Sequence, residues 1–370
     1  MKKALIILPT YNEKDNIEKI VKLILKQEPF VSPIWSIEIL IVDSHSPDQT
    51  SAVVKKLQKI YPEKIHLLET EKKGLGNAYY LGFNYALEKI NPFIIFEMDA
   101  DLSHNPNDIP RFLKEIEKGA DFVIGSRYIK GGSIPKEWAW YRKIFSILGN
   151  IIVKFGFMIH SINDWTSGFR AIKSWVIKSS LSFVKNYSGY VFQIAILDWA
   201  YKKGAKIKET PINFIDRRFG RSKISFGHYI FQIIWYILNY SSFIKFLIVG
   251  TIGFLIDFGM FFIFVEKIKL PIWLSTSISA EIAIISNFVL NNFWSFSYKK
   301  ITGSPLTYLL KFVKFNLISI GSIIIQAVGI ELTAFFLGRS GVYLYKILII
   351  AFLIIPYSYF MYNKIVWQKK

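Results

Sequence analysis

The chain has 370 residues, and its 46 Lys and Arg against 27 Asp and Glu give a formal net charge of +19. It contains no cysteine, which excludes disulfide scaffolds, thiol catalysis, iron–sulfur clusters and Cys-ligated zinc. Its five histidines leave little for a His-based metal cage, and its 52% hydrophobic residues exclude a disordered basic protein. A basic chain that is also apolar overall must keep these two properties in different segments.

Residues 1 to about 225 are predicted to form a soluble α/β domain. Buried strands are expected at residues 4–8, 37–42, 65–68, 93–98 and 122–124, and helices at residues 14–26, 50–60, 76–90 and 109–118. This alternation is typical of βαβ units on a mostly parallel sheet, whose ligands bind beyond the carboxyl ends of the strands. The first apolar run ends at Pro9, which is too early for a signal peptide.

Polar turns follow the first two predicted strands, at residues 9–13 and 43–50. Each has a residue suited to cap the next helix, Asn12 in the first turn and Asp48 or Thr50 in the second. Each also has a carboxylate beyond its capping needs, Glu13 and Asp43, and the pair suits a base and ribose. The alternative is that both segments are plain strand-to-helix turns. Residues 74–79 lack the third glycine of a dinucleotide fingerprint and are expected to form a tight turn into a helix.

The strand expected at residues 93–98 is followed by two carboxylates, Asp99 and Asp101. Residues two apart point the same way in an extended chain. Adjacent anions are costly unless a cation joins them, and oxygen ligands without Cys or His favour Mg²⁺ or Mn²⁺, which bind diphosphates. The segment therefore indicates a metal and diphosphate site, with a capped loop as the alternative.

Three segments carry the cations that diphosphate chemistry needs. Arg127 follows the strand at 122–124, Arg142 and Ser146 share a helical pattern, and residues 217–223 form a basic loop with Arg217 and Lys223. The alternative for this loop is a patch that attracts lipid headgroups, worth about 1 kcal/mol per charge.

The rest of the chain is apolar. Residues 138–159 and 226–240 mix aromatic, apolar and basic residues and are expected to be helices lying at a membrane interface, with buried core helices as the alternative. From residue 241 onward there are only 12 basic and 4 acidic residues. Four runs there, at residues 246–265, 271–290, 315–337 and 343–361, are close to the roughly 20 residues of a membrane-spanning helix.

Charged residues predict how these four helices are oriented. Seven lysines fall on the side of the N-terminal domain (Lys299, Lys300, Lys311, Lys314, Lys364, Lys369 and Lys370), against Lys267, Lys269 and Arg339 on the other side. The positive-inside rule then places the N-terminal domain and both termini in the cytoplasm. Asp257, Glu281 and Glu331 are expected to face the interior of the bundle, paired with Lys346 or polar neighbours.

These motifs resemble the dolichol-phosphate mannose synthase branch of the family 2 glycosyltransferases. The resemblance rests on residues 9–13, 43–50, 99–104, 125–128, 166–171 and 217–223, in this order. Residues 243–367 resemble a GtrA-like membrane domain, notably at 245–250 and 287–294. The resemblance implies a Rossmann-like GT-A domain at residues 1–225, an interfacial linker at 226–242 and a four-helix transmembrane domain at 243–370.

The resemblance also implies roles for individual residues. Those expected to bind the nucleotide-sugar are Pro9, Tyr11, Glu13, Ile41, Asp43, Asp99, Ala100, Asp101, Ser103, Arg127, Arg217 and Lys223. Asp101 and Ser103 would hold Mg²⁺ or Mn²⁺, and Arg127, Arg142 and Ser146 would hold the acceptor phosphate. The chain departs from the family pattern at Ser44, Gln49 and Ser103, where relatives often have Asp, Gly and Gln.

The expected activity is inverting transfer of a sugar to a polyprenyl or dolichyl phosphate, giving a lipid-linked sugar for glycosylation. Mannose from GDP-mannose is favoured by the resemblance alone, because guanosine and uridine donors both suit an acidic contact such as Asp43. The alternatives are a UDP-sugar transferase of the same kind and a lipid-linked-sugar carrier. A processive polysaccharide synthase is disfavoured, because the sequence has no Q-x-x-R-W motif. Nucleic acid is not an expected partner.

Overall fold

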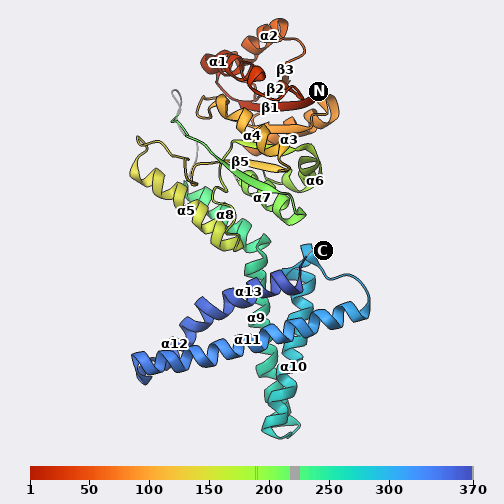
Figure 1. The fold of residues 1–370 in the computed structure, drawn as a ribbon, viewed down its shortest axis with the longest axis vertical. Coiled ribbons are helices and arrows are strands. Elements are labelled where there is room, and N and C mark those ends of the chain that lie inside the picture. Colours follow the sequence, from red (N-terminus) through yellow and green to blue (C-terminus); the bar gives the residue numbers. More distant parts are fainter. Residues whose placement is uncertain (188, 190, 217–225, 369–370) are drawn as a thin grey trace. The chain divides into compact units, whose positions relative to one another are not determined.

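The computed structural model describes residues 1–187, 189, 191–216 and 226–368 (Figure 1). They fall into two compact units. The N-terminal unit comprises Met1–Phe155 and Ile159–Tyr236, and the C-terminal unit comprises Gly156–Met158 and Ile237–Lys370.

The N-terminal unit is built on a seven-stranded sheet with the order β3-β2-β1-β4-β6-β5-β7. Six of its strands run in one direction, and β6 lies antiparallel between β4 and β5. The strands are β1 (Lys2–Thr10), β2 (Trp35–Asp43), β3 (Ile65–Glu69), β4 (Ile94–Glu97), β5 (Phe122–Ser126), β6 (Arg170–Lys173) and β7 (Ile207–Pro211). A mostly parallel sheet of this kind gives the unit the predicted Rossmann-like architecture.

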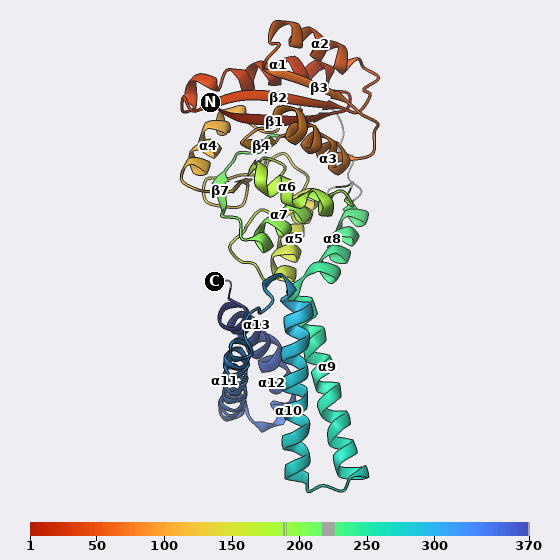
Figure 2. The ribbon, with the colours of Figure 1, turned by 90° about the vertical axis from the view of Figure 1, so that its right-hand side faces the viewer.

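Helices cover both faces of this sheet, and Figure 2 shows α1 and α2 on the side opposite to α3. One face packs against α1 (Lys14–Leu25), α2 (Thr50–Ile60) and α4 (Ile109–Glu117). The other face packs against α3 (Leu75–Tyr85), where a Cβ on Gly82 would lie only 3.1 Å from Val42. Two further helices, α6 (Ser174–Val184) and α7 (Val191–Lys203), lie beside α3, and Phe192 of α7 stacks on Tyr79 at 5.9 Å. Because both faces are covered, the central strands are mostly apolar.

The five predicted strands and four predicted helices are present, with bounds shifted by a few residues. The helix expected at 76–90 ends as the π-helical segment η2 (Ala86–Ile90), and η1 (Glu28–Phe30) and η3 (Pro106–Asp108) are short 3₁₀ turns. Strands β6 and β7 were not predicted.

The predicted cap of α1, Asn12, was wrong, whereas Asp48, one of the two residues predicted to cap α2, does accept a hydrogen bond from the first backbone N–H of that helix. The capping positions of α1 and α2 are Glu13 and Gln49, and neither side chain caps its helix. The Asp48 carboxylate instead accepts hydrogen bonds from the backbone N–H groups of Lys14, at 2.9 Å, and Thr50, at 3.0 Å. One partly exposed turn residue thereby serves the N-termini of both helices.

Helices α5 (Trp140–Phe157) and α8 (Phe226–Tyr240) occupy the segments predicted as interfacial. Both carry large exposed side chains, including Trp140 and Phe155 on α5 and Phe231 and Trp235 on α8. The helices are confirmed, whereas their position at a membrane surface stays a prediction.

The C-terminal unit contains four helices long and apolar enough to cross a membrane: Ser242–Lys267, Ile272–Ser295, Pro305–Leu337 and Leu344–Val366. Their parts are α9 (Ser242–Phe262), η4 (Ile263–Lys267), α10 (Ile272–Leu290), η5 (Asn291–Ser295), α11 (Pro305–Leu337), α12 (Val342–Ile349), η8 (Ile350–Ile354), α13 (Ile355–Met361) and η9 (Tyr362–Val366), with 3₁₀ turns η6 (Ser297–Lys299) and η7 (Arg339–Gly341) between them. Helices α9 and α10 lie side by side in both views (Figures 1 and 2). Helix α11 begins ten residues before the predicted run. It includes Lys311 and Lys314, which were expected in the connection before the helix.

The expectation that the acidic residues of the spans face the interior holds only for Asp257, which accepts a hydrogen bond from Ser279 at 2.6 Å. Glu281 and Glu331 are exposed on the surface of the bundle, so the expectation was wrong for them. No ion pair joins either to Lys346 within the described residues. The physical reason is that at most 22% of any span window is buried, which leaves few interior positions.

Candidate active site

A cavity of about 350 Å³ lies beyond the carboxyl ends of β1 and β4. Its lining includes six of the predicted residues: Pro9, Tyr11, Glu13, Asp99, Ala100 and Asp101. The other lining residues are Thr10, Ser44, Lys72, Gly74, Leu75, Ala78 and Gly189. A cavity of about 470 Å³ in the C-terminal unit is mainly apolar, so the carboxylate-lined cavity is the candidate active site.

Lys72 is a lining residue that the sequence analysis missed. Its Nζ lies 3.5 Å from the centroid of the Tyr11 ring, within cation–π distance. Lys72 follows β3, whose carboxyl end lies at the same edge of the sheet as those of β1 and β2. Its position just after a strand was therefore the signal that could have identified it.

Asp43 is buried at the end of β2, outside the cavity lining. Its Oδ1 accepts hydrogen bonds from Thr10 Oγ1, at 2.8 Å, and Ser46 Oγ, at 2.6 Å, and its Oδ2 accepts one from Ser46 N at 2.9 Å. In this structure the carboxylate therefore joins the turns that follow β1 and β2. Ile41 is fully buried in the core of the sheet. The contact of these two residues with a nucleoside stays a prediction.

The two carboxylates after β4 lie in a turn held by hydrogen bonds. Asp101 is buried, and its Oδ1 accepts from Ser103 N at 3.0 Å and from Ser103 Oγ at 2.5 Å. The side chain of Asp99 is one-third exposed, and a Cβ on Gly168 would lie 3.9 Å from both its carboxylate oxygens. The turn includes Leu102 at a φ of +66°. Both carboxylates border the same cavity, as the sequence predicted.

The His104 side chain is hydrogen-bonded to the backbone of this turn. Its Nδ1 accepts a hydrogen bond from the backbone N–H of Asp99 at 3.1 Å, so the proton of the neutral ring is on Nε2. The ring stacks on Phe169 at 5.1 Å. Burial lowers the pKa of His104 to about 4, which outweighs the opposing effect of the Asp101 charge, so the imidazole is neutral near pH 7. His104 lies within the motif at residues 99–104, but no role was predicted for it from the sequence.

The cavity offers oxygen ligands that fit a hard divalent cation. Asp99 and Asp101 supply carboxylates, and no group of three or more His, Asp or Glu residues that could hold a metal occurs in the part of the chain that is described. Such an ion would complete its coordination with water and diphosphate oxygens. Ser103 Oγ donates to Asp101, and its role as a metal ligand stays a prediction.

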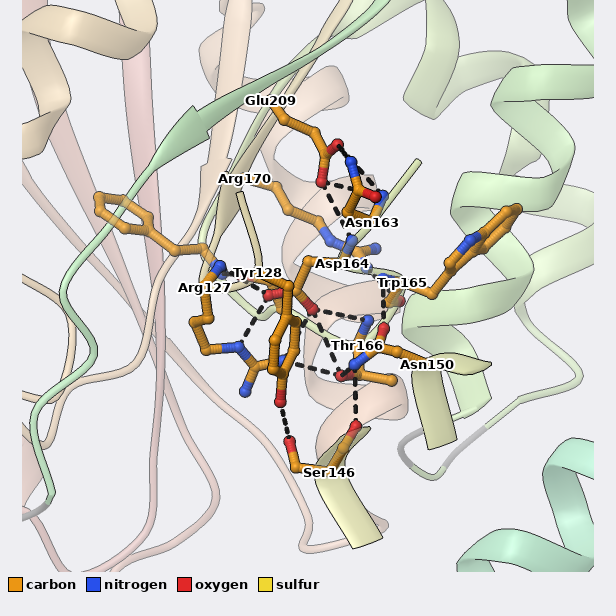
Figure 3. A network of polar contacts seen from close by, with 12 residues as sticks. Arg127, Tyr128, Ser146, Asn150, Asn163, Asp164, Trp165, Thr166, Arg170 and Glu209 are labelled. Carbon is orange, nitrogen blue, oxygen red and sulfur yellow. Dashed lines mark hydrogen bonds and ion pairs between the residues drawn. The ribbon is translucent and has the colours of Figure 1, made fainter. Parts of the chain in front are cut away.

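Arg127 is held by a buried carboxylate that the sequence analysis missed (Figure 3). Its Nε donates to Asp164 Oδ2 at 2.8 Å, and its Nη2 donates to Asp164 Oδ1 and Thr166 Oγ1, both at 2.7 Å. Burial raises the pKa of Asp164, but the charge and hydrogen bonds of Arg127 outweigh this effect and lower the pKa below its ordinary value. Asp164 is therefore ionised, and it fixes the orientation of the guanidinium.

The predicted acceptor residues lie one turn apart on α5. Arg142 Nη1 donates to Asp216 Oδ1 at 3.2 Å, and its guanidinium lies 4.0 Å above the Trp138 ring. Ser146 Oγ is 2.6 Å from the Tyr128 hydroxyl. Arg217 and Lys223, also predicted at the site, lie outside the described residues.

Comparison with known proteins assigns the two parts of the chain separately. Residues 5–177 match the family described as glycosyl transferase family 2, and residues 245–367 match the family described as GtrA/DPMS, transmembrane domain. The second match and the four apolar helices identify a membrane protein.

The chain aligns with most of the length of two known relatives. The chain is 38% identical to polyprenol monophosphomannose synthase of Mycolicibacterium smegmatis, over 60% of this chain and 81% of that protein. It is 33% identical to dolichol-phosphate mannosyltransferase of Pyrococcus furiosus, over 84% of this chain and 85% of that protein. A crystal structure of glucosyl-3-phosphoglycerate synthase from Mycobacterium tuberculosis with Mn²⁺, UDP and glucosyl-3-phosphoglycerate aligns at 17% identity, over 64% of this chain and 79% of that chain, with a TM-score of 0.46. This last overlap is too loose to assign a donor or a metal. The two relatives and the family match establish that the chain belongs to the family 2 glycosyltransferases.

Proposed function

We propose that this glycosyltransferase transfers mannose from GDP-mannose to the phosphate of a polyprenyl phosphate, inverting the configuration at the sugar C1. The observation that carries the proposal is a cavity with two carboxylates at the end of β4, in a chain that also has four membrane helices. The names of the two relatives, a polyprenol monophosphomannose synthase and a dolichol-phosphate mannosyltransferase, support the sugar and the class of acceptor.

The central problem of this reaction is electrostatic, because two anions must approach each other. A phosphate oxygen of the acceptor attacks C1 as the nucleoside diphosphate leaves. The acceptor phosphate is ionised near pH 7, so its oxygen needs no general base, and the protein's task is to bring the substrates together. Arg142 and Ser146 would hold the acceptor phosphate from α5. Arg127, whose Nε and Nη2 donate to Asp164 and Thr166, would add its positive charge beside the diphosphate. The family resemblance also assigns Arg217 and Lys223 to the diphosphate, to which they would add positive charge.

Asp99 and Asp101 would hold Mg²⁺ or Mn²⁺ at the cavity, with Ser103 beside Asp101. Bound there, the ion would neutralise charge on the leaving diphosphate. The neutral His104 keeps the Asp99 backbone in place without adding positive charge to the turn.

The same cavity would also hold the nucleoside. Pro9, Tyr11 and Glu13 line it, and Lys72 above the Tyr11 ring adds a cation there. An acidic contact suits both guanine and uracil, so the choice of GDP rests on the two relatives. A UDP-sugar is the competing donor. Thermal shift measurements with GDP, UDP and their sugars would separate these donors, and a shift with UDP but not GDP would reject GDP-mannose.

The activity is tested by incubating membranes that contain the protein with labelled nucleotide-sugars, Mn²⁺ or Mg²⁺, and polyprenyl phosphate. A labelled lipid extractable into organic solvent is the expected product. If no donor gives such a lipid, the transferase proposal fails and the carrier alternative gains support.

Asp101→Ala is expected to abolish transfer, because it removes a buried carboxylate that is predicted to bind the metal ion. The matched control is Asp15→Ala on the exposed face of α1, which should leave turnover unchanged. Turnover within tenfold of the wild type in Asp101→Ala would contradict the metal assignment. Thermal unfolding of both variants checks that the fold is retained.

Arg142→Ala is expected to raise the KM for polyprenyl phosphate by at least tenfold, because it removes one charge-assisted contact of about 1.5–3 kcal/mol. The KM for the nucleotide-sugar should change little. Lys143→Ala, at the next position of α5, is the control, since Lys143 Nζ donates only to the Lys136 carbonyl among the described contacts. Equal losses for both substrates in Arg142→Ala would contradict its role at the acceptor.

A further inference from the structure

Helix α5 presents a third polar residue next to the two predicted acceptor residues. Arg142, Ser146 and Asn150 follow one another at intervals of four, which places them on one face of the helix. Asn150 is buried, and its Nδ2 donates to the Ser146 carbonyl at 3.0 Å. The proposed function gives Asn150 no role.

Asn150 reaches from α5 to the segment that holds Arg127 (Figure 3). Its Oδ1 accepts from the backbone N–H of Trp165 at 2.7 Å, and its Nδ2 donates to Thr166 Oγ1 at 3.2 Å. The same Thr166 oxygen accepts from Arg127 Nη2 at 2.7 Å. One hydroxyl group thus connects the acceptor helix to the arginine predicted to bind the diphosphate.

The surroundings of this connection make it stiff. The backbone N–H groups of Asn163 and Asp164 both donate to the Glu209 carboxylate, at 3.1 and 3.0 Å, which fixes the segment before Thr166 on β7. Arg127 Nη2 donates both to Asp164 Oδ1 and to Thr166 Oγ1, which belong to the same segment. The guanidinium therefore has little freedom to turn independently of Thr166. A shift of α5 at Asn150 is therefore transmitted to Arg127, because buried hydrogen bonds are costly to leave unmade.

We propose that Asn150 is a positioning residue that, through the Thr166 hydroxyl, couples acceptor binding on α5 to donor binding at Arg127. Polyprenyl phosphate held by Arg142 and Ser146 fixes α5, and Asn150 and Thr166 then hold Arg127 in its diphosphate-binding orientation. The bound acceptor thereby restricts Arg127 more than Asp164 alone does, and the nucleotide binds more tightly to the restricted arginine. The inference rests on the proposed function, since it requires both substrates to bind where that function places them.

The coupling is measured as the ratio of two dissociation constants. Full-length protein in nanodiscs with Mn²⁺ is titrated with GDP, or with UDP if the donor screen selects it, in the absence and presence of undecaprenyl phosphate. The acceptor is expected to tighten nucleotide binding about fivefold or more in the wild type. A ratio of one in a wild type that makes the lipid product would overturn the inference and leave the proposed function standing.

Thr166 offers a matched pair of variants for the same measurement. Thr166→Val removes the hydroxyl at nearly constant shape and should reduce the ratio to about one. Thr166→Ser keeps the hydroxyl and should retain the coupling. Asn150→Ala removes the donor on α5 and should also reduce the ratio of dissociation constants to about one. Adding Thr166→Val to this variant should leave the ratio unchanged. A wild-type ratio in Asn150→Ala would mean that the coupling does not pass through Asn150, which would overturn the inference.

Asn84→Ala controls for the loss of a helical asparagine. Asn84 Nδ2 also donates to the carbonyl four residues earlier, that of Tyr80, at 2.8 Å. This variant should keep the wild-type ratio even if its unfolding temperature falls. If Asn84→Ala lost the coupling to the same extent as Asn150→Ala, the effect would be one of general destabilisation and the inference would be wrong. Failure of every donor to give a lipid product would instead refute the proposed function, and with it this coupling.

Discussion

Glu97 is a fully buried carboxyl group two residues before Asp99. Neither of its oxygens has a hydrogen-bond partner among the described residues, and the nearest cation, Arg170 Nε, is 3.8 Å away. Burial raises the pKa of Glu97 to about 7, although the charge of Arg170 acts in the opposite direction. The cost of burying its charge exceeds the attraction to Arg170, so the group stays protonated well above its ordinary pKa.

This raised pKa makes the stability depend on pH. The unfolded chain releases the Glu97 proton near pH 4.5, whereas the folded chain keeps it until about pH 7. The contribution of Glu97 is therefore fully present below pH 4.5 and is lost as pH rises to about 7, by up to about 3 kcal/mol. Glu97→Gln, which cannot ionise, should gain stability relative to the wild type over this range. Thermal unfolding midpoints at intervals between pH 4.5 and 8 would measure the difference.

Glu63→Gln, at an exposed position, is the control for this experiment. Its midpoint should follow that of the wild type across the range. A constant difference between Glu97→Gln and the wild type from pH 4.5 to 8 would contradict the raised pKa.

Single residues also show which parts of the site could be predicted from the sequence. Asp99 and Asp101 were found because an apolar strand followed by two close carboxylates is a local pattern. Asp164 and Asn150 were not, because their importance comes from partners 37 and 15 residues away in the chain. A buried carboxylate that orients an arginine leaves no local pattern, and only the folded chain brings the two together.

Among the elements, the start of α2 requires an unusual backbone conformation. Gln49 precedes this helix at a φ of +69° and a ψ of 30°, in the left-handed region. A side chain there is costly, and glycine avoids that cost. The family resemblance, which placed glycine at this position in many relatives, agrees with the observed backbone.

Gln49→Gly is therefore expected to stabilise the protein, by roughly 0.5–1 kcal/mol, since the relief of strain outweighs the greater flexibility of glycine in the unfolded chain. The measurement is the thermal unfolding midpoint in detergent. Lys56→Gly, at an exposed position within the same helix, is the opposite control and should cost about 1 kcal/mol. A loss of stability in both variants would contradict the argument.

Strands β6 and β7 show what the hydrophobic pattern misses among elements. Strand β6 has four residues, two of them basic, and it inserts antiparallel between β4 and β5. Strand β7 is an edge strand with a polar sequence, IKETP. The pairing of such short strands is decided by residues far away in the chain. Their sequences also have too few apolar positions to show the alternation of apolar and polar residues that is typical of a strand. The longer strands and helices of the first half, in contrast, were predicted with bounds shifted by only a few residues.

At the scale of the whole molecule, the cytoplasmic position of the N-terminal unit stays a proposal that rests on the distribution of lysines. The absence of cysteine makes it directly testable, because any introduced thiol is unique. Thr302→Cys and Ser340→Cys place thiols in exposed segments at the two ends of α11, and Asn186→Cys marks the N-terminal unit. A membrane-impermeant maleimide applied to intact cells should label only Ser340→Cys.

Inverted membrane vesicles provide the complementary control. Labelling should then occur at Thr302→Cys and Asn186→Cys and be lost at Ser340→Cys. If Thr302→Cys and Asn186→Cys were labelled in intact cells, the orientation would be the reverse of the one proposed.

The length of α11 has a consequence for the membrane itself. Its 33 residues measure about 50 Å, against a hydrocarbon thickness of about 30 Å. Within the C-terminal unit, α11 crosses α9 and α10 steeply (Figure 1), so these helices cannot all stand along the bilayer normal. Such a bundle accommodates bilayer thickness by leaning, and each ångström of mismatch costs a fraction of a kcal/mol. The acyl-chain length of the surrounding lipids sets the thickness of the bilayer, and thereby how far the membrane-spanning helices of this enzyme tilt.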